Sequence, residues 1–162
     1  MTIWRAAFLS LIVAGGATVH GIAASQAAAD SRTRVERTAT GTFDVDLTPE
    51  ADADGGIATL RIAKTFHGDL DGTSTGRMLA VMTDIDGSAG YVAMERVTAT
   101  LASRKGGFAL QHSGTMDRGA QSLSIAVVPD SGTGALAGIA GTMTIRVEGG
   151  THFYSLRYTL PD

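Results

Sequence analysis

The chain has 162 residues, of which 44% are hydrophobic and 18% are charged, a composition typical of one compact domain with a packed core. Its net charge of −3 and the absence of a basic run argue against nucleic acid as a partner. The sequence contains no cysteine, which excludes disulfides and thiolate-bound metals as a source of stability.

The N-terminal residues have the pattern of a secretory signal peptide. A short segment ending in the positive charge of Arg5 precedes an apolar run, Ala6 to Ala24, that contains no charged residue. Ala27 and Ala29 then supply small side chains at the −3 and −1 positions of a cleavage site. An uncleaved membrane anchor is the alternative, although three glycines and a histidine within the apolar run weaken it.

Cleavage before Asp30 would divide the chain into three parts. We expect residues 1–29 to be the signal peptide, residues 30–38 a flexible lead-in, and residues 39–162 a single β-barrel domain. The protein would then be exported, periplasmic or secreted, and would have no contact with the membrane after cleavage.

The mature sequence alternates between apolar and polar residues with a period of two, which is typical of β-strands. Eight such segments follow one another with short connections, and an open sheet of eight strands would leave two exposed edges. Closure removes both edges, so the sequence predicts an all-β fold, a closed eight-stranded antiparallel meander barrel. The predicted strands are 42–47, 59–62, 77–85, 89–102, 107–116, 122–128, 142–147 and 151–160.

Three Asp-x-Asp-Gly sequences occur, at residues 52–55, 69–72 and 84–87. Clustered carboxylates suit calcium, but these sequences lack the additional oxygen ligands of a calcium-binding loop. Asp-Gly is also a common hairpin turn, because glycine adopts a positive φ without steric cost. We therefore predict three turns and no metal at these positions.

Alternation places Glu95 and His112 on the apolar face of the hairpin formed by residues 89–116. A two-residue turn at residues 104–105 would pair Glu95 with Gly114, which would leave open space beside the carboxylate. In this register Glu95 and His112 are diagonal neighbours on adjacent strands, within reach of each other's side chains.

The next hairpin is predicted to turn at residues 118–119, which pairs His112 with Ile125 and Gly114 with Leu123. Apolar residues of the last strands would complete the inner wall of the barrel. They are Leu123, Ile125, Val127, Met143, Ile145, Val147, Tyr154, Leu156 and Tyr158.

Four further residues are candidates for contact with a ligand: Lys64, Tyr91, Gly114 and Tyr158. Lys64 alternates with apolar residues, which suits an inward orientation, but the sequence favours the other interpretation, a strand-end lysine that extends to solvent. The two tyrosines would offer phenols to a ligand or would pack as core residues with their hydroxyls at the rim.

Four sequence motifs together resemble the bacterial domain-of-unknown-function 3224 family: residues 66–70, 90–98, 111–116 and 129–141. The resemblance covers residues 40–160. Known folds of that family resemble the allene oxide cyclase barrel, a calycin-like eight-stranded meander barrel also seen in dirigent proteins. The resemblance therefore implies the same fold as the strand pattern, and it implies no particular reaction.

A carboxylate and an imidazole on an apolar face define the candidate site. Glu95 would orient His112, and the pair would serve a ligand or act as catalytic acid and base, unless it is a structural pair that satisfies itself. The leading hypothesis is binding of a small hydrophobic molecule inside the barrel. The alternatives are a cyclase or isomerase that transfers protons through Glu95 and His112, and a structural, oligomeric envelope protein with a filled barrel.

No cofactor is expected, and no metal site either. His67 and His152 could suggest zinc, but their spacing matches no pattern of zinc ligands. A homo-oligomer is compatible with every one of these hypotheses.

Export predicts that the mature protein, isolated from its own host, begins at or near Asp30, because signal peptidase cuts after a small-x-small sequence. N-terminal sequencing measures this directly. Recovery of intact Met1 in a soluble cytoplasmic fraction would contradict the prediction.

Overall fold

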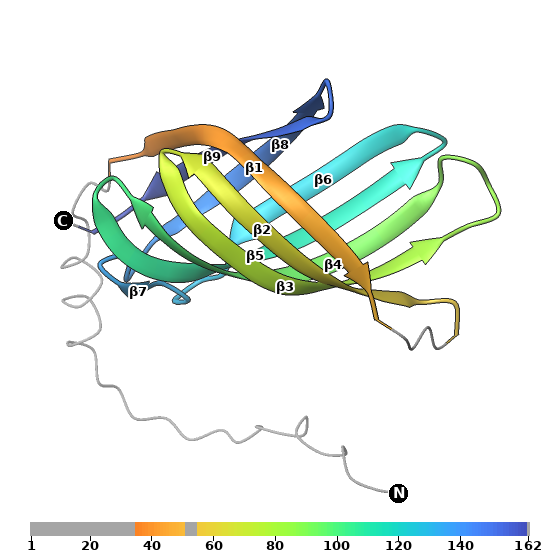
Figure 1. Ribbon diagram of the computed structural model, residues 1–162, viewed down its shortest axis with the longest axis horizontal. Coiled ribbons are helices and arrows are strands. Elements are labelled where there is room, and N and C mark those ends of the chain that lie inside the picture. Colours follow the sequence, from red (N-terminus) through yellow and green to blue (C-terminus); the bar gives the residue numbers. More distant parts are fainter. Residues whose placement is uncertain (1–34, 51–54, 162) are drawn as a thin grey trace, which may run out of the picture. The chain divides into compact units, whose positions relative to one another are not determined.

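The computed structural model describes residues 35–50 and 55–161, so the predicted signal peptide and most of the lead-in lie outside the described residues. The described part of the chain forms nine β-strands and includes no helix long and apolar enough to cross a membrane (Figure 1). The strands are β1 (Arg37–Pro49), β2 (Ala58–Gly68), β3 (Leu70–Met82), β4 (Ala89–Leu101), β5 (Arg104–Asp117), β6 (Ala120–Val127), β7 (Thr133–Gly134), β8 (Ala140–Glu148) and β9 (Thr151–Thr159).

Eight of these strands close into an antiparallel barrel (Figure 1). Strands β1 to β6 pair in chain order, β6 pairs with β8, β8 pairs with β9, and β9 returns to β1. The two-residue strand β7 pairs with the start of β5, inside the connection between β6 and β8. The prediction of a closed eight-stranded meander barrel is therefore confirmed.

The register of the β5–β6 hairpin agrees with the sequence pattern. Its turn lies at residues 118–119, where φ is 48° at Arg118 and 91° at Gly119. His112 lies opposite Ile125, as predicted.

The turn of the β4–β5 hairpin lies two residues earlier than predicted. Its central residues are Ala102 and Ser103, with φ of 49° and 64°, instead of residues 104–105. Two-residue turns with positive φ at both positions favour Asn and Gly. Neither Ala nor Ser signals such a turn, which is why the sequence pattern misplaced it.

Moving the turn shifts the β4–β5 pairing by four residues. Glu95 lies opposite Leu110, instead of Gly114, and His112 lies opposite Ala93. Because the shift is an even number, every side chain stays on its predicted face. Glu95 and His112 therefore remain diagonal neighbours on adjacent strands, along the opposite diagonal from the predicted one.

The Asp-x-Asp-Gly sequences have three different outcomes. Residues 84–87 form the β3–β4 turn as predicted, and most of the first sequence lies outside the described residues. The turn predicted at residues 69–72 is displaced toward the N-terminus. The last β2–β3 pair is Phe66 with Gly72, so the hairpin reverses at residues 67–71, with φ of 107° at Gly68, and β3 already begins at Leu70. The first half of β3 is rich in Gly, Thr and Ser, so it shows no apolar alternation and was missed as a strand.

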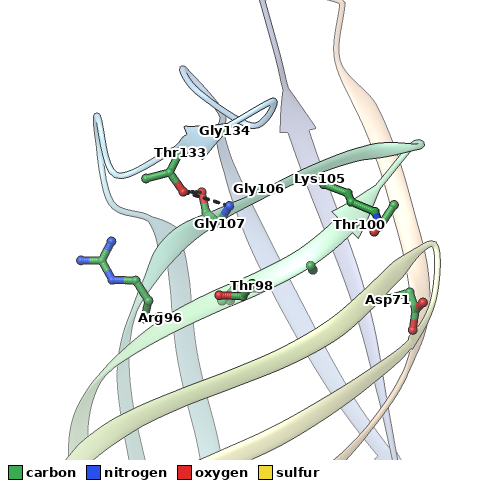
Figure 2. A pocket seen from close by; sticks show the side chains of 11 residues that line it. Asp71, Arg96, Thr98, Thr100, Lys105, Gly106, Gly107, Thr133 and Gly134 are labelled. Atoms are coloured by element: carbon green, nitrogen blue, oxygen red, sulfur yellow. Dashed lines mark hydrogen bonds between the residues drawn. The ribbon is translucent and has the colours of Figure 1, made fainter.

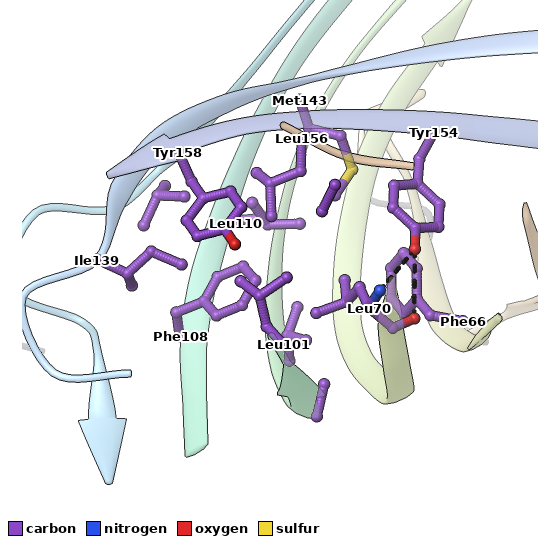
Figure 3. Close-up of a cluster of buried hydrophobic side chains, with 14 of the residues drawn as sticks. Phe66, Leu70, Leu101, Phe108, Leu110, Ile139, Met143, Tyr154, Leu156 and Tyr158 are labelled. Carbon is purple, nitrogen blue, oxygen red and sulfur yellow. Dashed lines mark hydrogen bonds between the residues drawn. The ribbon is translucent and has the colours of Figure 1, made fainter. Parts of the chain in front are cut away.

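One end of the barrel is filled by an apolar core (Figure 3). The turns at Gly68 and Ala102 and the connection between β6 and β8 lie at this end, and Leu136 and Ile139 of that connection are fully buried in the core. The core also contains Phe66, Leu70, Leu101, Phe108, Leu110, Met143, Tyr154, Leu156 and Tyr158.

The opposite end of the barrel is open. Alternation places Leu47, Met82, Leu123 and Val147 on the inner face, yet all four are exposed. These residues lie near the turns at that end, and the described residues of those turns leave them exposed. We call this ring of inward-facing apolar side chains the mouth.

Truncating Leu136, the loop residue that closes the core, should destabilise the barrel. The Leu136→Ala change leaves a cavity in a fully buried site and should lower the free energy of unfolding by about 2–5 kcal/mol. The matched control is Leu79→Ala on the outer face of β3, where the side chain is 47% exposed. Urea unfolding of both variants measures the difference, and equal midpoints would show that the connection contributes no packing.

Candidate functional site

The described part of the chain contains four buried polar or charged side chains, and they lie together inside the barrel. Lys64, Ser74, Glu95 and His112 come from the four consecutive strands β2, β3, β4 and β5. Alternation turns each of them inward, because each shares its face with apolar core residues. We call these four residues the polar centre.

Small residues of β3 bring the polar centre together. Ser74 lies opposite Lys64, and Gly76 lies opposite Glu95. A Cβ atom at Gly76 would come within 2.9 Å of the Glu95 side chain. Because β3 presents only a hydroxymethyl group and a hydrogen at these positions, the long side chain of Lys64 reaches across β3 to Glu95 on β4.

The Glu95 carboxylate accepts two short hydrogen bonds. Lys64 Nζ donates to Oε1 at 2.5 Å, and Ser74 Oγ donates to Oε2 at 2.6 Å. The Lys64 ammonium also lies 4.8 Å from the centre of the Phe43 ring, a cation–π distance. Lys64 therefore points inward, and the interpretation that its ammonium extends to solvent is wrong.

His112 approaches the same carboxylate without hydrogen-bonding to it. Its Nε2 lies 2.9 Å from Oε1 of Glu95, a distance that would suffice, but the direction of approach lacks hydrogen-bond geometry. Nε2 is buried and has no hydrogen-bond partner in the structure. The contact is therefore a close electrostatic one, and the protein encloses Nε2.

The environment keeps Glu95 ionised. Burial by itself raises the pKa of this carboxyl, but the contacts with His112, Lys64 and Ser74 outweigh burial and lower the pKa to about 2. Burial and the nearby Glu95 charge together raise the pKa of Tyr91, so its phenol is neutral near physiological pH.

A cavity of about 320 Å³ extends from the polar centre toward the mouth. Lys64, Glu95 and His112 line it together with Tyr91. The remaining wall is mostly apolar and includes Phe43, Val45, Ile62, Met78, Leu123 and Ile145. A second cavity of about 340 Å³ lies nearer the mouth and shares Met78, Tyr91 and Leu123 with the first.

The predicted site residues therefore separate into two groups. Lys64, Glu95, His112 and Tyr91 line one cavity, whereas Tyr158 packs in the core at the filled end and does not line it. The open space predicted at Gly114 is absent, because the shifted register places Tyr91 opposite this glycine.

The Tyr91 ring fills the space that a side chain at Gly114 would need. A Cβ atom at Gly114 would lie 2.4 Å from the ring. Gly114 therefore leaves room for the Tyr91 ring, and this is its contribution to the first cavity. It lines the second cavity, beside Tyr91.

Two contributors were missed in the sequence. Ser74 lies in the half of β3 that showed no strand pattern, so nothing signalled its inward position. His152 was considered only as a zinc ligand, yet it lines the cavity and stacks on Phe43 with 5.0 Å between ring centres.

A larger hollow, of about 540 Å³, lies on the outside of the barrel between β4, β5 and β7 (Figure 2). Thr98, Thr100 and Lys105 line it, and Thr133 accepts a hydrogen bond from the Gly107 amide at 3.1 Å. No buried titratable side chain faces this hollow. Size alone therefore does not identify the site, and the inner cavity is the better candidate.

Comparison with known proteins identifies relatives of unknown function. Residues 39–158 match the family model described as "Protein of unknown function (DUF3224)". A solved structure of a protein with unknown function from that family, from Shewanella oneidensis MR-1, is 44% identical, with a TM-score of 0.75. The similarity covers 79% of this chain and 99% of that chain. No curated protein matches the sequence.

The lowered pKa of Glu95 predicts a specific loss of stability in acid. Its ionised form stabilises the fold fully above the ordinary pKa of 4.5, and this contribution is lost as the pH falls toward about 2. Across this range the wild-type protein should lose about 3 kcal/mol more of its unfolding free energy than the Glu95→Gln variant. Urea unfolding at several pH values gives both profiles. Parallel profiles would contradict the assigned ionisation, and Asp117→Asn is a surface control.

Proposed function

The chain belongs to the DUF3224 family, and from the site in this member we propose that the barrel binds one small, largely hydrophobic molecule through its mouth. The observation that carries the proposal is the mostly apolar cavity of about 320 Å³ that Lys64, Glu95 and His112 line. On the N-terminal pattern, we place this binding outside the cytoplasm.

The energetics of the empty cavity favour a ligand. The apolar wall contributes roughly 25 cal/mol for each Å² of ligand surface that it removes from water. The two neighbouring cavities, of about 320 and 340 Å³, also lie within the size range of small-molecule sites.

The cyclase or isomerase alternative is less well supported. A catalytic acid or base works best with a pKa near the working pH, because it must both accept and release a proton. Glu95 has a pKa of about 2 and is held by Lys64 and Ser74. It is suited to holding a fixed negative charge and to orienting its neighbours, and less suited to exchanging protons.

The structural alternative required a filled barrel. Only one end of this barrel is filled, and the other contains two neighbouring cavities, one of which is lined by residues of the polar centre. A purely structural barrel gains more stability from a complete apolar core than from a buried ion pair beside a cavity. The open half is therefore the feature that favours binding.

The proposal predicts that protein purified from its own host retains a small molecule. Native mass spectrometry should show an added mass that organic extraction removes. Leu123→Trp should abolish it, because this residue lines both cavities at the mouth and a larger ring would obstruct entry.

Leu79→Trp is the matched control for that variant. Leu79 is 47% exposed and Leu123 is 42% exposed, but Leu79 lies on the outer face of the barrel. The control should keep the added mass and should also keep binding of the neutral dye Nile red. If both variants keep the dye, or if both lose it to the same extent, the result would argue against binding inside the barrel.

A further inference from the structure

Apolar side chains gather on the outside of the barrel, over β3 and β4 and beside the start of β2. Four of them lie on the outward side of β3 and β4, one directly precedes β2, and each is between 42% and 53% exposed. Single exposed apolar residues are common, whereas a group of neighbours marks a surface that another molecule covers. We call this group the β3–β4 patch; it consists of Ile57, Leu79, Val81, Val92 and Met94.

The strand register makes these side chains contiguous. Leu79 lies directly opposite Val92. Val81 follows Leu79 on the same side of β3, toward the mouth, and Met94 follows Val92 on the same side of β4, away from the mouth. Ile57 extends the patch beside Val81. The Leu79–Val92 pair is therefore the centre of the patch.

Positive charge gathers at the end of the patch away from the mouth. Arg61 and Arg77 share the single carboxylate of Glu50, at distances of 3.3 and 3.2 Å. Arg96 is exposed on the outward side of β4 and has no ion-pair partner among the described residues. Because three arginines face one glutamate, this end of the patch has an excess of positive charge.

Negative charge lies at the mouth end of the patch. Asp84 and Asp86 are both exposed in the β3–β4 turn, and neither has an ion-pair partner in the part of the chain that the structure describes. Asp84 is five residues beyond Leu79 toward the mouth, and Arg96 is four residues beyond Val92 in the opposite direction. At about 3.3 Å per residue, these two charges lie roughly 17 and 13 Å from the centre of the patch, on opposite sides of it.

We propose that the β3–β4 patch is the contact between two copies of this chain, which pack face to face with their strands antiparallel. A two-fold axis that lies in the contact, perpendicular to the strands, places the mouth end of each patch over the opposite end of its partner. Leu79 and Val92 then meet the same two residues of the partner at the centre of the contact.

Charge selects this orientation. With the strands antiparallel, Asp84 of each copy lies over the end of the patch that holds the partner's Arg96, and the two side chains together can span the roughly 10 Å between packed sheets. The other two-fold axis in the plane of the contact, parallel to the strands, would bring carboxylates against carboxylates. A second copy is therefore a partner whose charges and apolar surface both match the patch.

The contact lies outside the barrel, and the patch lines neither inner cavity, so this inference is independent of the proposed function. Leu79 belongs to the patch. The Leu79 variants that serve as controls above are therefore measured at protein concentrations at which the dimer has dissociated, so that they report on the barrel alone.

Sedimentation equilibrium of the protein purified from its own host tests the contact. Wild type should form dimers as its concentration is raised. Val92→Glu buries two unpaired carboxylates at the centre of the contact and should raise the dissociation constant about a hundredfold. Val147→Glu is the matched control, because Val147 is 58% exposed and Val92 is 53% exposed, but Val147 lies at the mouth. The control should dimerise like wild type.

Charge reversal tests the orientation. Arg96→Glu brings a carboxylate against Asp84, and Asp84→Arg brings a guanidinium against Arg96, so each change alone should weaken the dimer about tenfold. The double variant restores an opposite-charge pair and should recover the affinity of wild type. Both residues are exposed, so these variants keep the barrel folded and decide the question even if Val92→Glu does not fold.

Three results would overturn the proposal. Wild-type protein that remains monomeric at every concentration has no such contact, and binding of that monomer to phosphatidylcholine vesicles would assign the patch to a lipid surface instead. Dimers that are unaffected by Val92→Glu would show that the copies meet elsewhere. A double charge variant that dimerises no better than the single variants would exclude the antiparallel orientation.

Discussion

An ionised carboxylate inside an apolar barrel needs hydrogen-bond donors or opposite charges around it. Glu95 is the carboxylate that imposes this requirement here. Its partners come from β2, β3 and β5, so one buried charge connects four consecutive strands. A slip of one residue in any of these strands would turn a partner outward and leave a charge unpaired in a region of low dielectric. The centre therefore specifies the strand register as well as forming part of the site.

The position of the polar centre also divides the interior. On one side lies a dense apolar core that the connection between β6 and β8 completes with Leu136 and Ile139. On the other side the wall is apolar but the space is open. Replacing a buried ion pair with apolar side chains is often neutral or stabilising. Keeping the pair beside an open cavity is consistent with a role in binding, where a fixed set of donors is worth more than additional packing.

Sequence alternation was sufficient for the barrel and for the orientation of Glu95 and His112, because a period of two depends only on which face a side chain occupies. It was insufficient where pairing depends on turns or on polar strands. Ala102 and Ser103 form a turn, although neither residue type is typical of one. The start of β3 is rich in Gly, Thr and Ser, so no apolar alternation indicated that Ser74 and Gly76 lie in a strand. The even shift in register preserved the faces, but it exchanged the neighbours of Glu95 and moved Tyr91 against Gly114.

A barrel that is filled at one end has a single opening. If the barrel binds the small molecule proposed above, that molecule cannot pass through it in one direction, as it would through a channel, so it must leave along the path by which it entered. The rate of exchange then depends on how quickly the bound molecule dissociates through this opening, because one molecule must leave before the next can enter. Any transfer to another surface has to take place at the ring of Leu47, Met82, Leu123 and Val147, where apolar side chains already meet water.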